Sequence, residues 1–119
     1  MITSVREFLN LRYGISTGSR ETAAAAVAGV TAAQLLPQDS RRLAFTYFNL
    51  SAGDTHYLRP MYAPTATRGI QVGPGGGNVS FNCLEDGEFV AYEWLVLSTG
   101  AASAYYCLET LIEVTEMVK

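Results

Sequence analysis

The chain has 119 residues, a length that suits one domain with a single hydrophobic core. Its formal net charge is −3 and its basic residues form no stripe, which excludes a surface built to bind nucleic acid. Charged residues make up 16% of the chain and hydrophobic residues 49%, so we expect part of the surface to be covered by another subunit.

The sequence contains no segment that we expect to enter a membrane. Its longest weakly polar run, residues 23–36, is too short to span a bilayer. Residues 1–14 lack the apolar run and the small-residue cleavage site of a signal peptide. We therefore expect a soluble, intracellular product with no membrane partner.

The N-terminal segment, residues 1–21, is expected to form an arm with a short helix. Residues 3–13 carry a serine cap, a glutamate three positions later and a narrow apolar stripe, which together favour a helix. Residues 14–21 are polar and rich in glycine and serine, which indicates a linker. The domain itself would then span residues 22–119.

The alanine-rich stretch, residues 23–30, has an ambiguous pattern. Its four alanines favour a helix, whereas Val27 and Val30 favour a strand. We expect a strand, because everything that follows has the pattern of β-structure. Leu35, Leu36 and Pro37 are then expected to lead into a turn.

From residue 41 onward, short segments alternate between apolar and polar residues and are separated by turn residues. The expected strands span residues 41–49, 56–61, 69–72, 78–84, 89–98 and 102–114, and the far end of the last is left open as a helical turn. The expected turns and loops span residues 51–54, 62–68, 73–77, 85–88 and 99–101. Short strands at this spacing predict an all-β fold, an antiparallel β-sandwich of jelly-roll-like type.

Two loops resemble binding motifs only superficially. The glycine run Gly73–Gly77 lacks the Lys-Ser/Thr pair and the following helix of a phosphate-binding loop, so we expect a turn that needs positive φ. The acidic segment Glu85, Asp86 and Glu88 lacks the regular spacing of an EF-hand, so a solvated turn is favoured over a Ca²⁺ site. We expect no metal and no cofactor.

The two cysteines and the single histidine have no motif around them. Cys83 and Cys107 lie far apart without a CxxC pair, which indicates two buried free thiols on neighbouring strands; a disulfide between them stays open. His56 has Ser51 and Asp54 nearby in sequence but no nucleophile elbow, so we expect an exposed histidine at the start of a strand.

Glu93 and Glu109 are the only pair that we weighed as catalytic carboxylates. A glycosidase would need both to face one cleft at a set separation, and nothing in the pattern indicates such a cleft. We expect them instead to lie at an edge or interface and to pair with Arg42, Arg59 or Arg68. The chain is therefore expected not to be an enzyme.

The order of features from Leu35 to Glu109 is similar to one seen in small virion proteins of tailed phages. A Leu-Pro step precedes the strand RLAFTYFNLS, and HYLRP, GIQVGPGGG, YEWLVLS and YYCLE follow in that order. This pattern resembles the capsid decoration and head-fibre-type accessory proteins. We expect Asn49 to close the turn after its strand, Arg42 to pair with a carboxylate across the sheet, and Trp94 to anchor the core.

The resemblance implies a structural virion protein, made in the host cytoplasm, that decorates a capsid as a symmetric homo-oligomer. A trimer is the expected order, and the expected partners are the major capsid protein or neighbouring virion subunits. The N-terminal arm would dock onto a neighbour. The alternative is a carbohydrate- or receptor-binding sandwich whose exposed aromatic rings stack on sugars, with Tyr57, Tyr62, Tyr92 and Trp94 as the platform.

Overall fold

The computed structural model of the chain describes residues 16–22 and 27–113. The helix expected over residues 3–13 lies outside the described residues. The strands are β1 (Ser16–Glu21), β2 (Val27–Ala28), β3 (Ala33–Leu36), β4 (Arg42–Asn49), β5 (His56–Pro60), β6 (Ile70–Val72), β7 (Asn78–Asn82), β8 (Trp94–Ser98) and β9 (Ser103–Glu113). A short helix, α2 (Cys83–Asp86), and a 3₁₀ helix, Gly87–Ala91, connect β7 to β8.

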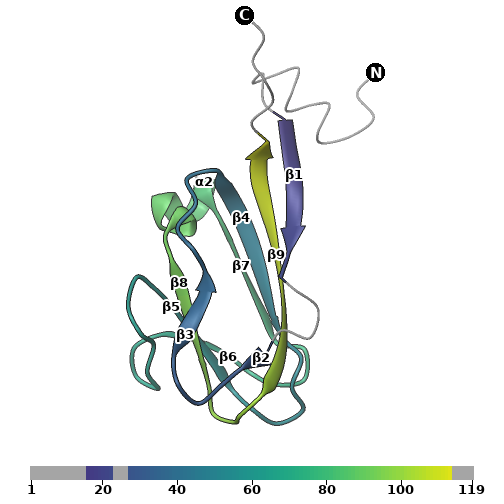
Figure 1. Cartoon of the computed structure of the whole chain (residues 1–119), viewed down its shortest axis with the longest axis vertical. Coiled ribbons are helices and arrows are strands. Elements are labelled where there is room, and N and C mark those ends of the chain that lie inside the picture. The colour runs from purple at the N-terminus through teal and green to yellow at the C-terminus, as the bar shows by residue number, and fades with distance from the viewer. Residues whose placement is uncertain (1–15, 23–26, 114–119) are drawn as a thin grey trace, which may run out of the picture.

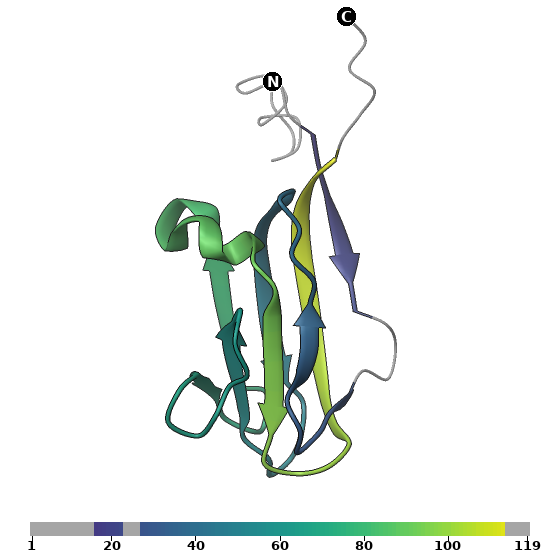
Figure 2. The ribbon, with the colours of Figure 1, turned by 60° about the vertical axis from the view of Figure 1, so that its left-hand side comes forward.

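The strands form two antiparallel sheets that pack face to face (Figures 1 and 2). The first sheet has the order β1-β9-β4-β7, with β2 also paired to β9, and the second has the order β3-β8-β5-β6. From β2 onward the chain passes to the opposite sheet at every connection except β5–β6. This alternation over eight strand positions is the jelly-roll arrangement, so the expected fold class is confirmed.

Alternation along the central strands builds the core between the sheets. Phe45 and Tyr47 of β4 point inward and are fully buried, whereas Thr46 and Phe48, which alternate with them, are partly exposed. Trp94 of β8 is also fully buried, and its ring lies 5.0 Å from that of Phe45. The Trp94 indole donates to the carbonyl of Phe89, so its one polar atom is satisfied. The expected core role of Trp94 is confirmed.

The strands expected over residues 41–49, 56–61 and 69–72 are present, each one residue shorter, and within the described part of the strand expected over residues 23–30 only Val27–Ala28 is a strand. Three other expectations are wrong. Residues 16–21 are a strand and not part of a linker, because their backbone pairs with the C-terminal half of β9. Residues 33–36 also form a strand, β3, where we expected the approach to a turn. The acidic segment is helical and not a hairpin, and β8 therefore begins only at Trp94.

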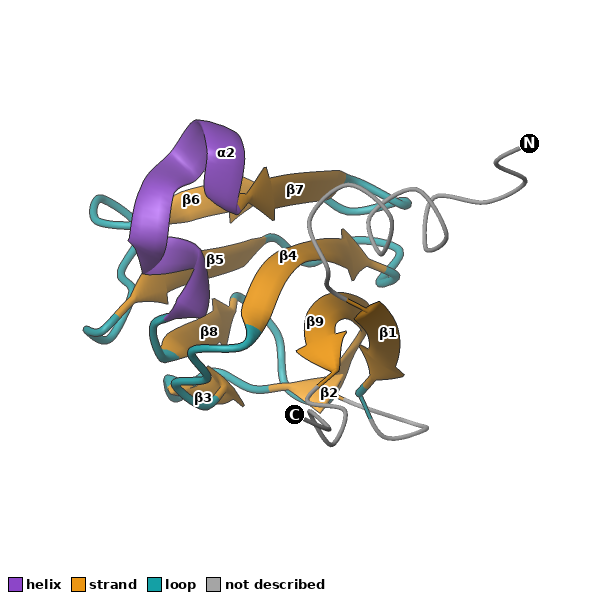
Figure 3. Ribbon diagram, turned by 90° about the horizontal axis from the view of Figure 1, so that it is seen from above, coloured by secondary structure: helices purple, strands orange, loops and turns teal. Residues whose placement is uncertain are grey.

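Seen from above, α2 and the 3₁₀ helix lie across one end of the sandwich, and β1 lies at the outer edge of the first sheet (Figure 3). Ser16 at the start of β1 is paired with Glu113 at the end of β9. The described chain therefore enters and leaves the sandwich side by side.

Candidate functional site

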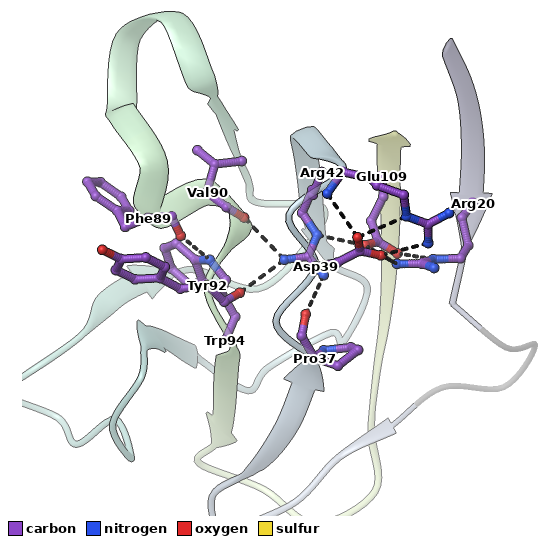
Figure 4. A network of polar contacts seen from close by, with 10 residues as sticks. Arg20, Pro37, Asp39, Arg42, Phe89, Val90, Tyr92, Trp94 and Glu109 are labelled. Atoms are coloured by element: carbon purple, nitrogen blue, oxygen red, sulfur yellow. Dashed lines mark hydrogen bonds and ion pairs between the residues drawn. The ribbon is translucent and has the colours of Figure 1, made fainter. Parts of the chain in front are cut away.

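A buried arginine occupies the helical end of the sandwich (Figure 4). The side chain of Arg42 has no exposed surface, and its Nε donates to Glu109 Oε2 at 2.7 Å. Its Nη1 donates to the carbonyls of Val90 and Tyr92 at 3.2 and 3.0 Å, and its Nη2 donates to the carbonyl of Pro37 at 2.6 Å. The expected pairing of Arg42 with a carboxylate across the sheet is confirmed, and the three backbone contacts are an addition that the sequence did not indicate.

Two further arginines complete this polar network. Arg20 of β1 clamps Glu109 with two hydrogen bonds of 2.8 Å, and its Nη2 also lies 3.3 Å from Asp39. Burial alone would raise the pKa of Glu109, but hydrogen bonds from Arg20 and Arg42 outweigh it, so its pKa lies below the ordinary value. Hydrogen bonds from Arg41, then from Arg20, hold the pKa of Asp39 well below its usual range. Both carboxylates are therefore ionised at neutral pH.

The network fixes the backbone of two segments that are distant in sequence. Arg42 donates hydrogen bonds to the carbonyl of Pro37 in one segment and to the carbonyls of Val90 and Tyr92 in the other. Between these contacts, the Asp39 amide donates to the carbonyl of Ala91 at 2.9 Å. The loop before β4 and the chain between the 3₁₀ helix and β8 are thus tied directly to each other.

A pocket of about 290 Å³ opens where these two segments meet the end of β5, and it is lined by Gln38, Met61, Tyr92 and Glu93. The Met61 amide donates to the carbonyl of Glu93 at 2.7 Å, which ties the third segment to the other two. The Tyr92 hydroxyl donates to Glu88, and the Gln34 amide donates to Glu93 Oε2. The pocket therefore combines a phenol ring, an apolar side chain, an amide and a carboxylate.

A second buried polar network lies at the other end of the sandwich, and here our expectation of an exposed His56 is wrong. His56 is fully buried, with its Nδ1 at 2.6 Å from the Tyr47 hydroxyl and its Nε2 at 2.7 Å from the Ser103 hydroxyl. Burial lowers the pKa of His56, so the imidazole is neutral at neutral pH. Closed off from solvent, this trio holds β4, β5 and β9 together and is placed to stabilise the fold.

The turn beside this network contains Asn49, which closes it as we expected. Its side-chain amide donates to the carbonyls of Asp54 and Val72, and its Oδ1 accepts from the amide and hydroxyl of Ser51. The Ser51 hydroxyl also donates to the Asp54 carbonyl. Ser51 is therefore engaged in the turn and makes no contact with His56 that would activate it as a nucleophile.

The outward face of the first sheet is nearly free of charge. Its register aligns Thr46 of β4 with Leu108 of β9, and Phe48 with Tyr106. The rings of Phe48 and Tyr106 lie 5.9 Å apart. Hydroxyl, amide and small side chains surround these residues. The outward residues of the four strands are Thr17, Ser19, Glu21, Ala44, Thr46, Phe48, Asn78, Ser80, Asn82, Ala104, Tyr106, Leu108, Thr110 and Ile112. Glu21 is the one ionisable acid among them, and it accepts a hydrogen bond from the Tyr106 hydroxyl.

The structure separates the residues that we had weighed as sites. Glu109 is buried in the arginine network, where its pairing with Arg42 is confirmed but its place at an edge is wrong, whereas Glu93 lies at the pocket. Cys83 is exposed and Cys107 is buried, and both are free, so the expectation of two buried thiols is wrong for Cys83. Trp94 is buried, which removes it from any sugar-stacking platform.

The acidic segment is arranged as a helix cap. The Asn82 side chain accepts from the Glu85 amide, and Asp86 accepts from the Asn82 amide. Among residues 16–22 and 27–113, no group of three or more histidine, cysteine or acidic side chains is placed to hold a metal ion. The same residues include no helix with the length and apolar character of a membrane span.

No protein-family model, no curated protein and no solved structure matches this chain.

Proposed function

We propose that the protein is a structural subunit that assembles with copies of itself through the outward face of the first sheet, as an accessory protein of a virion. The observation that carries this proposal is the composition of that face, in which aromatic and aliphatic side chains lie among neutral polar ones with Glu21 as the single acid. Interface cores share this enrichment in aromatic residues and depletion of charge.

The size of the face approaches that of a standard contact. Its strands hold 6, 11, 8 and 5 residues, which at a spacing of about 4.8 Å and a rise of about 3.3 Å per residue gives a projected area of roughly 480 Å². A standard interface buries about 800 Å² of accessible surface on each partner, and side chains that project from a sheet expose more area than its projection. Symmetry also favours this composition, because near a rotation axis the same side chains of neighbouring copies approach one another and like charges would repel.

The oligomer that we propose is a trimer, the order that the resemblance to phage accessory proteins implies. Light scattering of the purified protein should give about three times the chain mass of 12.9 kDa. Substituting Leu108→Arg places a charge in the middle of the face and should return the mass to that of one chain. Leu97 is a matched control, because it is a half-buried leucine on the outward side of β8 in the other sheet. A monomeric wild-type protein, or equal loss of assembly in Leu97→Arg, would contradict the proposal.

Attachment to the particle is assigned to the N-terminal arm. Its last part, Ser16–Glu21, is strand β1, so the segment available for docking is residues 1–15. Deleting residues 1–15 should leave the thermal unfolding transition and the oligomer mass in place while abolishing co-sedimentation with the capsid. Absence of the wild-type protein from purified virus particles would show that the virion role is wrong.

A further inference from the structure

We propose that the pocket lined by Gln38, Met61, Tyr92 and Glu93 is a binding site for one neutral pyranose ring of a glycan. The assembly function does not require this pocket, and the two proposals rest on different surfaces. The pocket lies between the loop before β4, the end of β5 and the start of β8, whereas the assembly face belongs to the other sheet.

The walls of the pocket are held in place before any ligand arrives. Gln38 lies between Pro37, whose carbonyl accepts from buried Arg42, and Asp39, whose amide bonds the carbonyl of Ala91. On the opposite wall the Tyr92 carbonyl accepts from the same arginine. A site whose backbone is already fixed loses little conformational entropy on binding, which favours affinity for a small ligand.

The backbone conformation of Met61 also indicates that the surrounding structure fixes the shape of the pocket. Its φ is +70°, a left-handed conformation that a non-glycine residue adopts at a cost. The hydrogen bond from its amide to the Glu93 carbonyl holds it there, with the side chain half exposed at the pocket. Strained backbone conformations of this kind are commonly found at ligand sites, where the surrounding structure holds the residue in place.

The side chains of the lining match the groups that a sugar presents. The ring of Tyr92 is oriented by its hydroxyl bond to Glu88 and offers a flat face for the C–H groups of a pyranose. A carboxylate has about four lone-pair positions, of which Gln34 uses one on Glu93, so adjacent hydroxyls can donate to the others. The amide of Gln38 both donates and accepts, as a ligand hydroxyl does.

Size and charge narrow the ligand class. A volume of about 290 Å³ is at the lower end for small-molecule sites and suits one ring. Glu93 in the lining and Glu88 beside it repel phosphate and carboxylate ligands. An alkylamine would be attracted by these acids, but its ammonium group is a donor only and cannot accept a hydrogen bond from the Gln38 amide. A neutral ring that carries several hydroxyl groups can contact all four side chains that line the pocket.

Titration of the ¹⁵N-labelled full-length protein with glucose, galactose, mannose and N-acetylglucosamine tests the site by NMR. At least one sugar should shift the backbone amides of Gln38, Met61, Tyr92 and Glu93 with a Kd of about 1 mM. Glu93→Gln should weaken that binding about tenfold, the loss expected for one pocket hydrogen bond. Tyr92→Leu should also weaken it, because it removes the flat ring that would face the sugar.

Glu85→Gln is the matched control, since it removes the same charge from an exposed position on α2 outside the pocket. It should bind the sugar as the wild-type protein does, and thermal unfolding should show each variant to be folded. No amide shift with any of the four sugars up to about 100 mM would overturn the proposal. Shifts with n-butylamine in their place, or equal sugar binding by Glu93→Gln, would overturn it too.

Discussion

Arg41 and Arg42 are adjacent in the chain but have opposite surroundings. Arg41 is exposed and pairs with Asp39, whereas Arg42 is buried and bonds Glu109 and three backbone carbonyls. Exposed ion pairs contribute little to stability because water screens them. Removing one partner of a buried pair is costly, since it leaves the other groups desolvated and unsatisfied.

The first prediction compares these two arginines. Arg42→Met should lower the free energy of unfolding by about 3–5 kcal/mol, because it leaves the carbonyls of Pro37, Val90 and Tyr92 without their donor. Arg41→Met should change it little. Urea unfolding followed by Trp94 fluorescence measures both variants. Similar midpoints for the two would show that the buried network does not stabilise the fold.

The second prediction concerns pH. Because burial lowers the pKa of His56 in the folded protein, the unfolded chain binds more protons at mildly acidic pH. The free energy of unfolding should therefore be highest above about pH 6.5 and should fall as the pH drops below it, by up to about 1.4 kcal/mol per pH unit. Urea unfolding at about pH 7.5 and about pH 5.5 measures the change.

His56 is the only histidine in the chain, so His56→Gln is a clean control. The variant should be less stable at both pH values but should lack most of the difference between them, because ordinary carboxylates are already ionised throughout this range. An unchanged difference in the variant would assign the pH dependence to another group.

Single residues were predictable where the chemistry is local. Asn49 bonds Ser51 and Asp54 in the turn that directly follows it, and its residue type and position indicate that role. The partners of His56, by contrast, are Tyr47 across the sandwich and Ser103 on the last strand, and only the folded topology brings them together. A lone histidine in a sequence carries no sign of such partners.

At the scale of elements, the loop Gly73–Gly77 requires a glycine at position 77. Gly75 and Gly76 have positive φ, and the loop docks on the turn after β4 through the bonds Gly75 N to Ser51 O and Gly76 N to Asn49 O. A Cβ on Gly77 would lie 2.3 Å from the carbonyl oxygen of Gly73, a backbone atom that cannot move aside alone.

The third prediction follows from this contact. Gly77→Ala should lower the free energy of unfolding by about 1–3 kcal/mol, because the loop must distort to admit the methyl group. Gly73→Ala meets nothing within 4 Å and should be neutral or slightly stabilising. Differential scanning calorimetry of the two variants distinguishes them. A Gly77→Ala variant as stable as the wild type would mean that the loop relaxes freely.

Strands whose residues alternate between the core and the outward face, such as β4 from Phe45 onward, were predictable, and the exceptions have physical causes. Strand β1 has a polar, glycine-containing sequence because it lies at a sheet edge and is held by backbone pairing with β9. The helix α2 had a readable start in Asn82 followed three residues later by Glu85, a capping pattern that the acidic run obscured. Apolar residues 89–91 continue the helical segment and were mistaken for the strand that follows.

At the scale of the whole molecule, the jelly roll places its two proposed working surfaces on different sheets. The first sheet offers a broad face with little charge, and the segments around the start of β8 in the second sheet form the pocket. Jelly rolls serve both as capsid components and as sugar-binding domains, so the fold alone does not choose between these roles. Separate surfaces allow one chain to have both.

The fourth prediction joins the two proposals and depends on both. A trimer that presents three pockets should bind a surface coated with a polymer of the recognised sugar at least about 100-fold more tightly than a single chain, because the later contacts are intramolecular. The Leu108→Arg variant should keep the wild-type affinity for the monosaccharide and lose this gain. Biolayer interferometry on the coated surface measures both. Equal apparent Kd values for wild type and Leu108→Arg on the polymer would show that assembly does not increase the affinity and that each pocket binds independently.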